Sequence, residues 1–197
     1  MRNEVSKTIN KNVSILWTGG WDSTYRMVEL SRMPTTVQPI YVYGDKRTSE
    51  HFEIRSMNKI LSKLREREET VATLLPIEFV AKKMIPLNND ISDAYNVISQ
   101  ETNLGSQHEW LARLAQIRPG LEIRTEAASL EASNILTTIH KYGKLAKDSD
   151  NDSYILDLKQ SSKELILLLG NFRFPIIDKT GQDMKANIEL WGYSDVM

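Results

Sequence analysis

Hydrophobic and polar positions change along the chain in blocks that predict strands and helices in turn. Short apolar runs rich in β-branched and aromatic residues are typical of buried strands, and apolar residues three and four positions apart are typical of helices. Four strands are expected, at Val13 to Trp17, Val37 to Gly44, Leu74 to Ile85 and Leu121 to Glu126. Helices are expected at Ser23 to Arg32, Ser49 to Glu69, Asp90 to Gln100, from Ser106 to a stop at Pro119, from the end of the fourth strand to about Tyr142, and at Thr180 to Trp191.

Polar residues at the ends of these blocks predict how the helices begin. Ser49 is expected to be the N-cap of its helix. Ser106 with Glu109, and Ser161 with Glu164 ahead of the run LILLL, have the spacing of capping boxes. The segment KDSDNDS, residues 147–153, is expected to be a solvated loop.

Strands that alternate with helices predict right-handed βαβ units and a mainly parallel sheet with helices on both faces. The expected fold class is therefore α/β, a three-layer α/β/α sandwich, in a single domain over residues 1–197 with a polar N-terminal arm at 1–12. Ligands of such sheets bind at the carboxyl ends of the strands. The segment VSILWTGGWDST, residues 13–24, occupies that position for the first strand.

Composition and charge argue against several classes of function. Apolar residues make up 41% of the chain and charged residues 26%, with a net charge of −1, so no broad attraction to nucleic acid or anionic membrane is expected. No apolar run reaches the roughly 18–20 residues of a membrane span, and the polar N-terminus lacks the core of a secretory signal, so we expect a cytoplasmic protein. The chain has no cysteine, and its three histidines have no ligand spacing, so no zinc site is expected.

The glycine pair in residues 13–24 is the strongest candidate for chemistry. Gly19 and Gly20 allow close approach of a ligand to the main chain, Thr18 and Ser23 add hydroxyls, and the following helix adds its dipole. The lysine of G-x-x-x-x-G-K-[ST] and the spacing of G-x-G-x-x-G are both missing. The residues alone therefore allow either an anion-binding loop or an ordinary turn in which Asp22 or Ser23 caps the helix.

The stretch TGGWDST, residues 18–24, resembles the S-G-G-x-D-S signature of the PP-loop ATPases, which have a HUP/PP-loop, Rossmann-like fold. Together with QPIYVYGDKRTS and LGSQHEWLA, it makes the chain similar to 7-cyano-7-deazaguanine synthase-like proteins over roughly residues 13–190. The resemblance implies an enzyme that cleaves ATP, with Mg²⁺, between the α- and β-phosphates. Such enzymes adenylate a carboxyl or carbonyl oxygen, and ammonia or another nucleophile then displaces AMP.

The resemblance also implies roles for particular residues. The pyrophosphate part of ATP would be held by Thr18, Gly19, Gly20, Asp22, Ser23 and Thr24, with Asp22 near Mg²⁺ and with Asp22 and Ser23 catalytic. The adenosine pocket would include Val42, Tyr43 and Asp45 at the end of the second strand. For Tyr43, a half-buried strand aromatic is an equal alternative.

Further residues are candidates for the substrate and for phosphate charge. Arg47, Gly105, Ser106 and Gln107 would approach nucleotide or substrate, although Arg47 has the alternative of an exposed loop residue and Ser106 that of a helix cap. Lys179, in IIDKTGQD, would neutralise charge on the phosphates in the transition state, or else lie in a solvated loop.

The chain departs from the nitrile-forming synthases in one respect. Those enzymes carry a cysteine cluster for structural zinc toward the C-terminus, and this chain has none, so the cluster is lost or the chain is a shortened form. Three hypotheses remain: a ligase that forms an amide or nitrile on a deazapurine-like acid, a PP-loop enzyme that modifies a nucleotide, peptide or protein, and a noncatalytic nucleotide-binding subunit. Homo-oligomers or a partner protein are compatible with each, and no membrane partner is expected.

Overall fold

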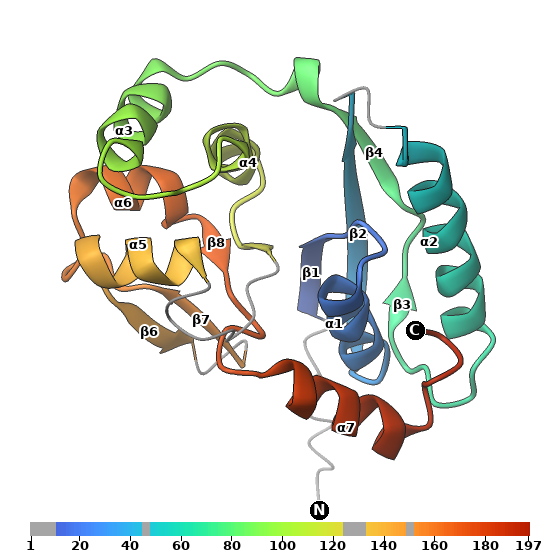
Figure 1. Ribbon diagram of the computed structural model, residues 1–197. Coiled ribbons are helices and arrows are strands. Elements are labelled where there is room, and N and C mark those ends of the chain that lie inside the picture. The colour runs from blue at the N-terminus through green and yellow to red at the C-terminus, as the bar shows by residue number, and fades with distance from the viewer. Residues whose placement is uncertain (1–10, 45–47, 124–132, 149–151) are drawn as a thin grey trace, which may run out of the picture.

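The computed structural model describes residues 11–44, 48–123, 133–148 and 152–197, and its centre is a six-stranded sheet (Figure 1). The strand order is β3-β2-β1-β5-β8, and β4 also pairs with β2. Every pairing in this sheet is parallel. The strands are β1 (Lys11–Leu16), β2 (Thr35–Tyr43), β3 (Thr73–Leu74), β4 (Glu78–Ala81), β5 (Leu121–Glu122) and β8 (Phe172–Arg173).

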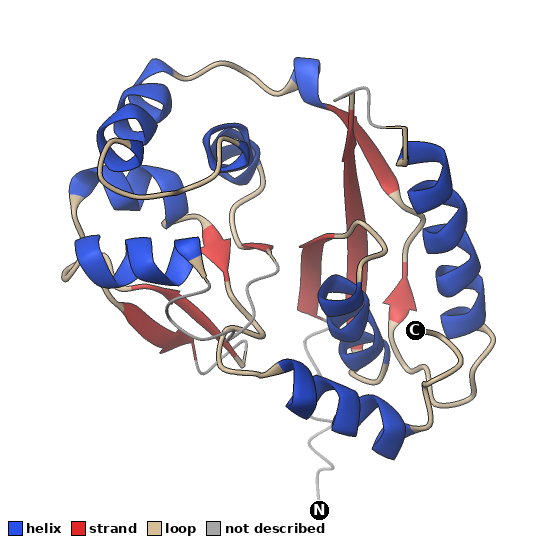
Figure 2. Ribbon diagram, in the orientation of Figure 1, coloured by secondary structure: helices blue, strands red, loops and turns tan. Residues whose placement is uncertain are grey.

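Helices cover both faces of the sheet, as Figure 2 shows. On β2, Val37 and Tyr41 pack into one core, whereas Ile40 and Val42 pack into the other, as the period of two in a strand requires. The structure confirms the predicted α/β fold of three layers. The first core is shared by α1 (Trp21–Ser31), α2 (Glu50–Arg65) and α7 (Gly181–Trp191), and the second by α3 (Asn89–Ser99), α4 (Gln107–Ile117), α5 (Asn134–Tyr142) and α6 (Lys163–Leu169).

The order of the strands creates a switch point between β1 and β5. From β1 the chain crosses through α1 to β2 on one side, and from β5 it reaches β8 on the other side through elements of the opposite helical layer. Ligands of open parallel sheets bind in the crevice where the strand order reverses. The loop between β1 and α1 therefore lies where such a sheet is expected to bind its ligand.

The predicted third strand, Leu74 to Ile85, is wrong in its length. The structure has two short strands, β3 and β4, followed by a 3₁₀ turn, η1 (Lys82–Met84). The carbonyl of Val37 accepts a hydrogen bond from the amide of Leu75. Every second residue of β2 faces the β3 and β4 side of the sheet in this way, and Pro39 is the residue that follows Val37 in this series. Pro39 and Pro76 both lack an N–H, so the ladder is interrupted there.

Two predicted capping boxes are also wrong, although the helices themselves form. Ser106 already has helical dihedral angles and its side chain makes no capping bond, and the carboxylate of Glu109 accepts from Ser92 (2.7 Å) and Arg113 (2.9 Å). The helix predicted after Ser161 is capped by Ser162, whose hydroxyl accepts from the amide of Leu165 at 3.2 Å.

The other predicted helix ends have mixed outcomes. Ser49 occupies the N-cap position of α2, but its hydroxyl donates to Glu53 (2.8 Å) rather than accepting from the backbone. Thr180 does cap α7, in a capping box with Asp183.

A β-hairpin stands where a solvated loop was predicted. Within residues 147–153, Lys147, Asp148 and Ser153 belong to strands, while 149–151 lie outside the described residues. Strands β6 (Leu145–Asp148) and β7 (Ser153–Leu156) pair antiparallel, and Tyr154 forms a bridge with Phe174 next to β8. The bridge attaches the hairpin to the edge of the main sheet, a long-range contact that the polar local sequence does not signal.

A buried ion pair joins α1 to β5. The guanidinium of Arg26 bonds Glu122 twice, through Nε and Nη2 at 2.8 Å each, and also bonds Glu29 through Nη1 at 2.6 Å. The side chains of Arg26 and Glu122 are 4% and 2% exposed. Burial by itself lowers the pKa of Arg26, but the hydrogen bonds and charge of Glu122, followed by those of Glu29, outweigh it and raise the pKa above its ordinary value.

We predict that Arg26→Met destabilises the protein by about 3–5 kcal/mol, because Glu122 is then left as a buried charge without this partner. Urea unfolding measures the loss. The double variant Arg26→Met with Glu122→Leu should recover much of it, since both charges are removed together. The exposed pair Lys185–Glu189 provides a control, and Lys185→Ala should change stability by less than about 0.5 kcal/mol. An additive double variant would contradict this account of the pair.

Tyr25 connects α1 to α7. Its hydroxyl donates to Glu29 (3.4 Å) and accepts from Asn187 (2.9 Å), and its ring stacks on Trp191 with centroids 5.7 Å apart. Burial, and next the charge of Glu29, raise the pKa of Tyr25 to about 12, although the hydrogen bond from Asn187 opposes the shift. The neutral phenol is therefore favoured in the folded state.

Stability should fall as the pH rises from about 10, the ordinary tyrosine pKa, to about 12, because the unfolded chain loses the Tyr25 proton first. Lysines titrate in the same range, so the wild type must be compared with Tyr25→Phe, for which the slope of unfolding free energy against pH should be shallower. Equal slopes in chemical denaturation would show that Tyr25 does not supply this dependence.

Candidate functional site

The loop after β1 is shaped by its backbone. The amide of Trp17 still donates to the carbonyl of Ile40 (2.9 Å), which extends the pairing with β2 one residue past the strand. The chain then turns through Gly19, whose φ is +71°, and α1 begins at Trp21 with Gly20 as its N-cap residue. The first helical bond runs from the amide of Thr24 to the carbonyl of Gly20 (2.9 Å). The first amides of a helix have no acceptor within the helix, which is why anions are favoured at helix N-termini.

The two glycines are present for different reasons. Gly19 has the left-handed conformation, and a Cβ added to it would lie 3.0 Å from Cγ of Met57 on α2. Gly20 has φ −73° and ψ 161°, which any residue adopts, and among the described residues an added Cβ would meet only Oγ1 of Thr18, at 3.6 Å. The fold therefore requires glycine at 19 and does not require it at 20. A bare backbone at Gly20 is what close approach of a ligand would need.

The polar side chains of the motif are largely buried in the first turn of α1. Asp22, Ser23 and Thr24 are 5%, 4% and 2% exposed. The Ser23 hydroxyl donates to the carbonyl of Gly20 (3.2 Å), and the Thr24 hydroxyl accepts from the indole of Trp17 (3.1 Å). These bonds tie the loop to the helix. The alternative in which Asp22 or Ser23 is the N-cap is wrong, because Gly20 occupies that position without a side-chain capping bond.

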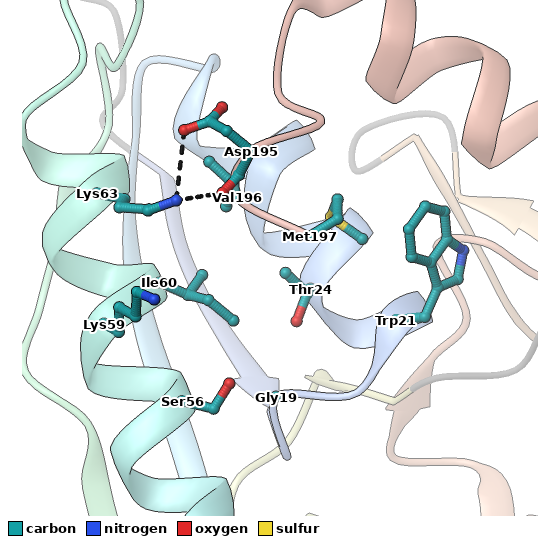
Figure 3. A pocket seen from close by; sticks show the side chains of 10 residues that line it. All are labelled: Gly19, Trp21, Thr24, Ser56, Lys59, Ile60, Lys63, Asp195, Val196 and Met197. Atoms are coloured by element: carbon teal, nitrogen blue, oxygen red, sulfur yellow. Dashed lines mark hydrogen bonds and ion pairs between the residues drawn. The ribbon is translucent and has the colours of Figure 1, made fainter.

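A pocket of about 370 Å³ opens beside the loop (Figure 3). Helix α2 provides one wall, and Figure 3 shows Trp21 across from it and the Ser56 hydroxyl pointing toward Gly19. The volume lies within the usual range for small-molecule sites. The pocket is lined by Gly19, Trp21, Thr24, Ser56, Lys59, Ile60, Lys63, Asp195, Val196 and Met197.

Two of the residues predicted for adenosine lie at the carboxyl end of β2. Val42 is 7% exposed in the core and Tyr43 is 41% exposed, both at the end of β2. Asp45 and Arg47 lie outside the described residues.

The other predicted substrate residues flank the start of α4. Gly105, Ser106 and Gln107 are exposed there, and Lys82, which follows β4, lies 5.2 Å from the ring of Trp110 in the first turn of α4. Burial lowers the pKa of neighbouring His108, although its bond with the Gly105 carbonyl opposes this, so His108 adds no positive charge near neutral pH.

The prediction for Lys179 is not supported by its position. Its Nζ lies 3.6 Å from Oε1 of Glu29. Glu29 is seven residues after Asp22 on α1, which places it about 10 Å farther along the helix axis from the loop. The ion pair accounts for this lysine, and the structure does not bring it to the loop. Ser56 and Lys59, which do line the pocket beside the loop, were missed. The sequence signal that could have found them is their spacing of three and four residues with Ile60 and Lys63, which places all four on one face of α2.

Two features are not found in the part of the chain that the structure describes: a cluster of metal-binding side chains and a membrane-spanning helix. That part contains no group of three or more histidine, aspartate or glutamate side chains able to hold a metal ion. None of its helices has the length and apolar character required to cross a membrane.

Comparison with known proteins places the chain in no family. No family model and no curated protein matches the chain. Among solved structures, it is similar to a predicted subunit of tRNA methyltransferase from Methanocaldococcus jannaschii, with 12% sequence identity and a TM-score of 0.43, over 91% of this chain and 74% of that chain. Values this low carry no conclusion about function, so function has to be argued from the residues of this chain.

The different needs for Gly19 and Gly20 predict different costs of substitution. Gly19→Ala should lower stability by at least about 1–2 kcal/mol, since it places a side chain in the left-handed region and against Met57. Gly20→Ala should cost about 1 kcal/mol or less, as a weaker N-cap. Thermal unfolding of both variants measures the difference. Equal losses would mean that the loop backbone differs from the one described.

Proposed function

We propose that this protein binds MgATP over the loop between β1 and α1 and transfers AMP to a carboxylate. The observation that carries the proposal is Gly20. It lies at a helix N-terminus and at the switch point of a parallel sheet, and no described residue crowds the space that a side chain would take there. An N-cap position favours glycine modestly, and close approach of phosphate to the main chain would also account for the bare backbone. The resemblance of residues 18–24 to the PP-loop signature is the reason to propose ATP as the nucleotide.

In this proposal, the loop amides and the start of α1 orient the polyphosphate and stabilise the charge that develops on it. Thr18 and Ser23 have hydroxyls near the same place, and Asp22 would hold Mg²⁺, which usually binds through one or two carboxylates together with phosphate oxygens. Val42 and Tyr43 would border the adenosine. Gly105 to Gln107 would border the substrate.

The chemistry is an in-line displacement. A carboxylate oxygen of the acceptor attacks the α-phosphorus, the bond from that phosphorus to the bridging oxygen breaks, and pyrophosphate leaves with the electron pair. An amine nucleophile then attacks the acyl carbon, and AMP leaves. By resemblance to 7-cyano-7-deazaguanine synthase-like proteins, 7-carboxy-7-deazaguanine with ammonia is the first acceptor pair to assay. The products of this step to seek by mass spectrometry are AMP, pyrophosphate and the amide. A nitrile would require a second ATP, which adenylates the amide oxygen so that this oxygen leaves with AMP as the C≡N bond forms and two protons are lost.

Gly20→Val should abolish MgATP binding detected by calorimetry while the protein stays folded, because the added methyl groups occupy the phosphate's position. Gly181→Val is a matched control, because Gly181 is the first residue of α7 and a Cβ there meets no described residue within 4 Å, while a Cβ at Gly20 makes only an ordinary contact with Thr18. The control should bind MgATP as the wild type does. Wild-type affinity in Gly20→Val would remove the loop from the nucleotide site and with it the proposed function.

A further inference from the structure

Strand β4 leaves an edge of the main sheet open. It pairs with β2 on one side, and no strand among the described residues pairs with its other side. Its residues are only partly covered: Phe79 is 46% exposed, and Val80 and Ala81 have intermediate exposure. The edge of a strand presents N–H and C=O groups that can pair with another chain. The far side of β4 is therefore a surface suited to one more strand.

The register of the sheet fixes which backbone groups face this edge. The carbonyl of Ile40 accepts from the amide of Trp17 on the β1 side of β2, so the next residue, Tyr41, directs its polar backbone groups to the β4 side. Tyr41 lies opposite Phe79, and in a parallel pair a residue bonds to the two neighbours of the residue opposite it. The backbone N–H and C=O of Phe79 therefore point away from β2, and so do those of Ala81, two residues later.

Two copies of β4 fit each other at this edge when they run antiparallel about a two-fold axis. In an antiparallel pair, alternate residues that lie directly opposite each other exchange both hydrogen bonds. If Phe79 of one copy lies opposite Ala81 of the other, the outward groups of both residues are used. Val80 then lies on the axis, opposite Val80 of the second copy. A large side chain meets a small one in each half of the interface, which lets the two surfaces interdigitate.

The charges at the ends of β4 favour this register over others. Glu78 begins the strand and Lys82 follows its last residue, so both lie two positions from Val80. About the two-fold axis, Glu78 of each copy faces Lys82 of the other, and opposite charges directly across two strands attract. Registers with Phe79 or Ala81 opposite its own copy place one of these charges against Val80 instead. The segment EFVAK, residues 78–82, is self-complementary in charge in one register.

Both charged residues can keep their contacts within the chain. The guanidinium of Arg118 bonds Oε1 of Glu78 at 2.9 Å, and an ionised carboxylate accepts several bonds at its two oxygens. Nζ of Lys82 lies 5.2 Å from the centroid of the Trp110 ring, and an ammonium group has three donors. Pairing across the axis therefore adds contacts without breaking these two.

We propose that this protein forms a two-fold symmetric dimer in which β4 pairs antiparallel with β4 of a second copy, so that the two parallel sheets join at this edge. None of the residues of the paired segment belongs to the loop after β1. The dimer and the proposed nucleotide site are therefore tested by separate experiments, and either can fail alone.

Sedimentation of the full chain over a range of concentrations should show a species of twice the monomer mass. Ala81→Pro should convert it to a monomer, because proline removes an outward N–H and the φ of −73° at this position already suits proline. Ala81→Ser keeps the N–H and should remain dimeric, and circular dichroism checks that both variants are folded. A wild type that is monomeric at every concentration, or a dimer unaffected by Ala81→Pro, would overturn the inference.

Exchanging the charges tests the register. Glu78→Lys and Lys82→Glu should each weaken dimerisation by about tenfold or more, because like charges then face each other in both halves of the interface. An equimolar mixture of the two variants should recover the affinity, since each chain supplies the charge that the other lacks. If the mixture dimerises no better than either variant alone, the proposed pairing is wrong.

A disulfide can report the position of the axis, because the chain has no cysteine of its own. Val80→Cys places two thiols at a pair without mutual hydrogen bonds, where Cα atoms are about 4.5 Å apart and within the range that a disulfide spans. Mild oxidation should give a covalent dimer. Val97→Cys, at a half-exposed position of α3, is the control and should stay monomeric on a denaturing gel. Equal yields from the two variants, or none from Val80→Cys, would contradict the proposal.

Discussion

The paired charges of Arg26 and Glu122 are the interaction on which the site depends. Removing two charges from water is costly, and only bidentate geometry with further bonds such as that to Glu29 offsets the cost. Both hydrogen bonds between Arg26 and Glu122 can form only when α1 lies at one position against β5. Since α1 follows the loop directly, the ion pair also fixes where the first-turn amides meet the carboxyl edge of the sheet.

Different parts of α1 have different partners. Its first turn holds the loop through the bonds of Ser23 and Thr24, and its middle is tied to β5 by Arg26. Tyr25, next to Arg26, contacts α7, and Glu29, nearer the end of the helix, pairs with Lys179 in the segment before α7. The proposed ligand therefore meets a helix that is held along its whole length, which is the preorganisation that electrostatic stabilisation of phosphate requires.

The loop after β1 differs in composition from a lysine-containing phosphate loop. In G-x-x-x-x-G-K-[ST] the lysine belongs to the motif itself. Here the motif has none, and the lysines that line the neighbouring pocket, Lys59 and Lys63, belong to α2. Gly19 fits the close approach of α2, because a Cβ there would lie 3.0 Å from Cγ of Met57.

The sequence by itself determined the helices, the parallel α/β sheet and the loop after β1, because these follow from local periodicity and from the alternation of strands with helices. Only the tertiary structure decided that Lys179 pairs with Glu29 away from the loop, that β6 and β7 pair antiparallel, and that β3 and β4 are separate. Each of those outcomes depends on contacts between residues far apart in the chain: Lys179 is taken by Glu29, the hairpin is held by Phe174, and Pro39 interrupts the ladder of its neighbour. Local patterns contain no information about such partners.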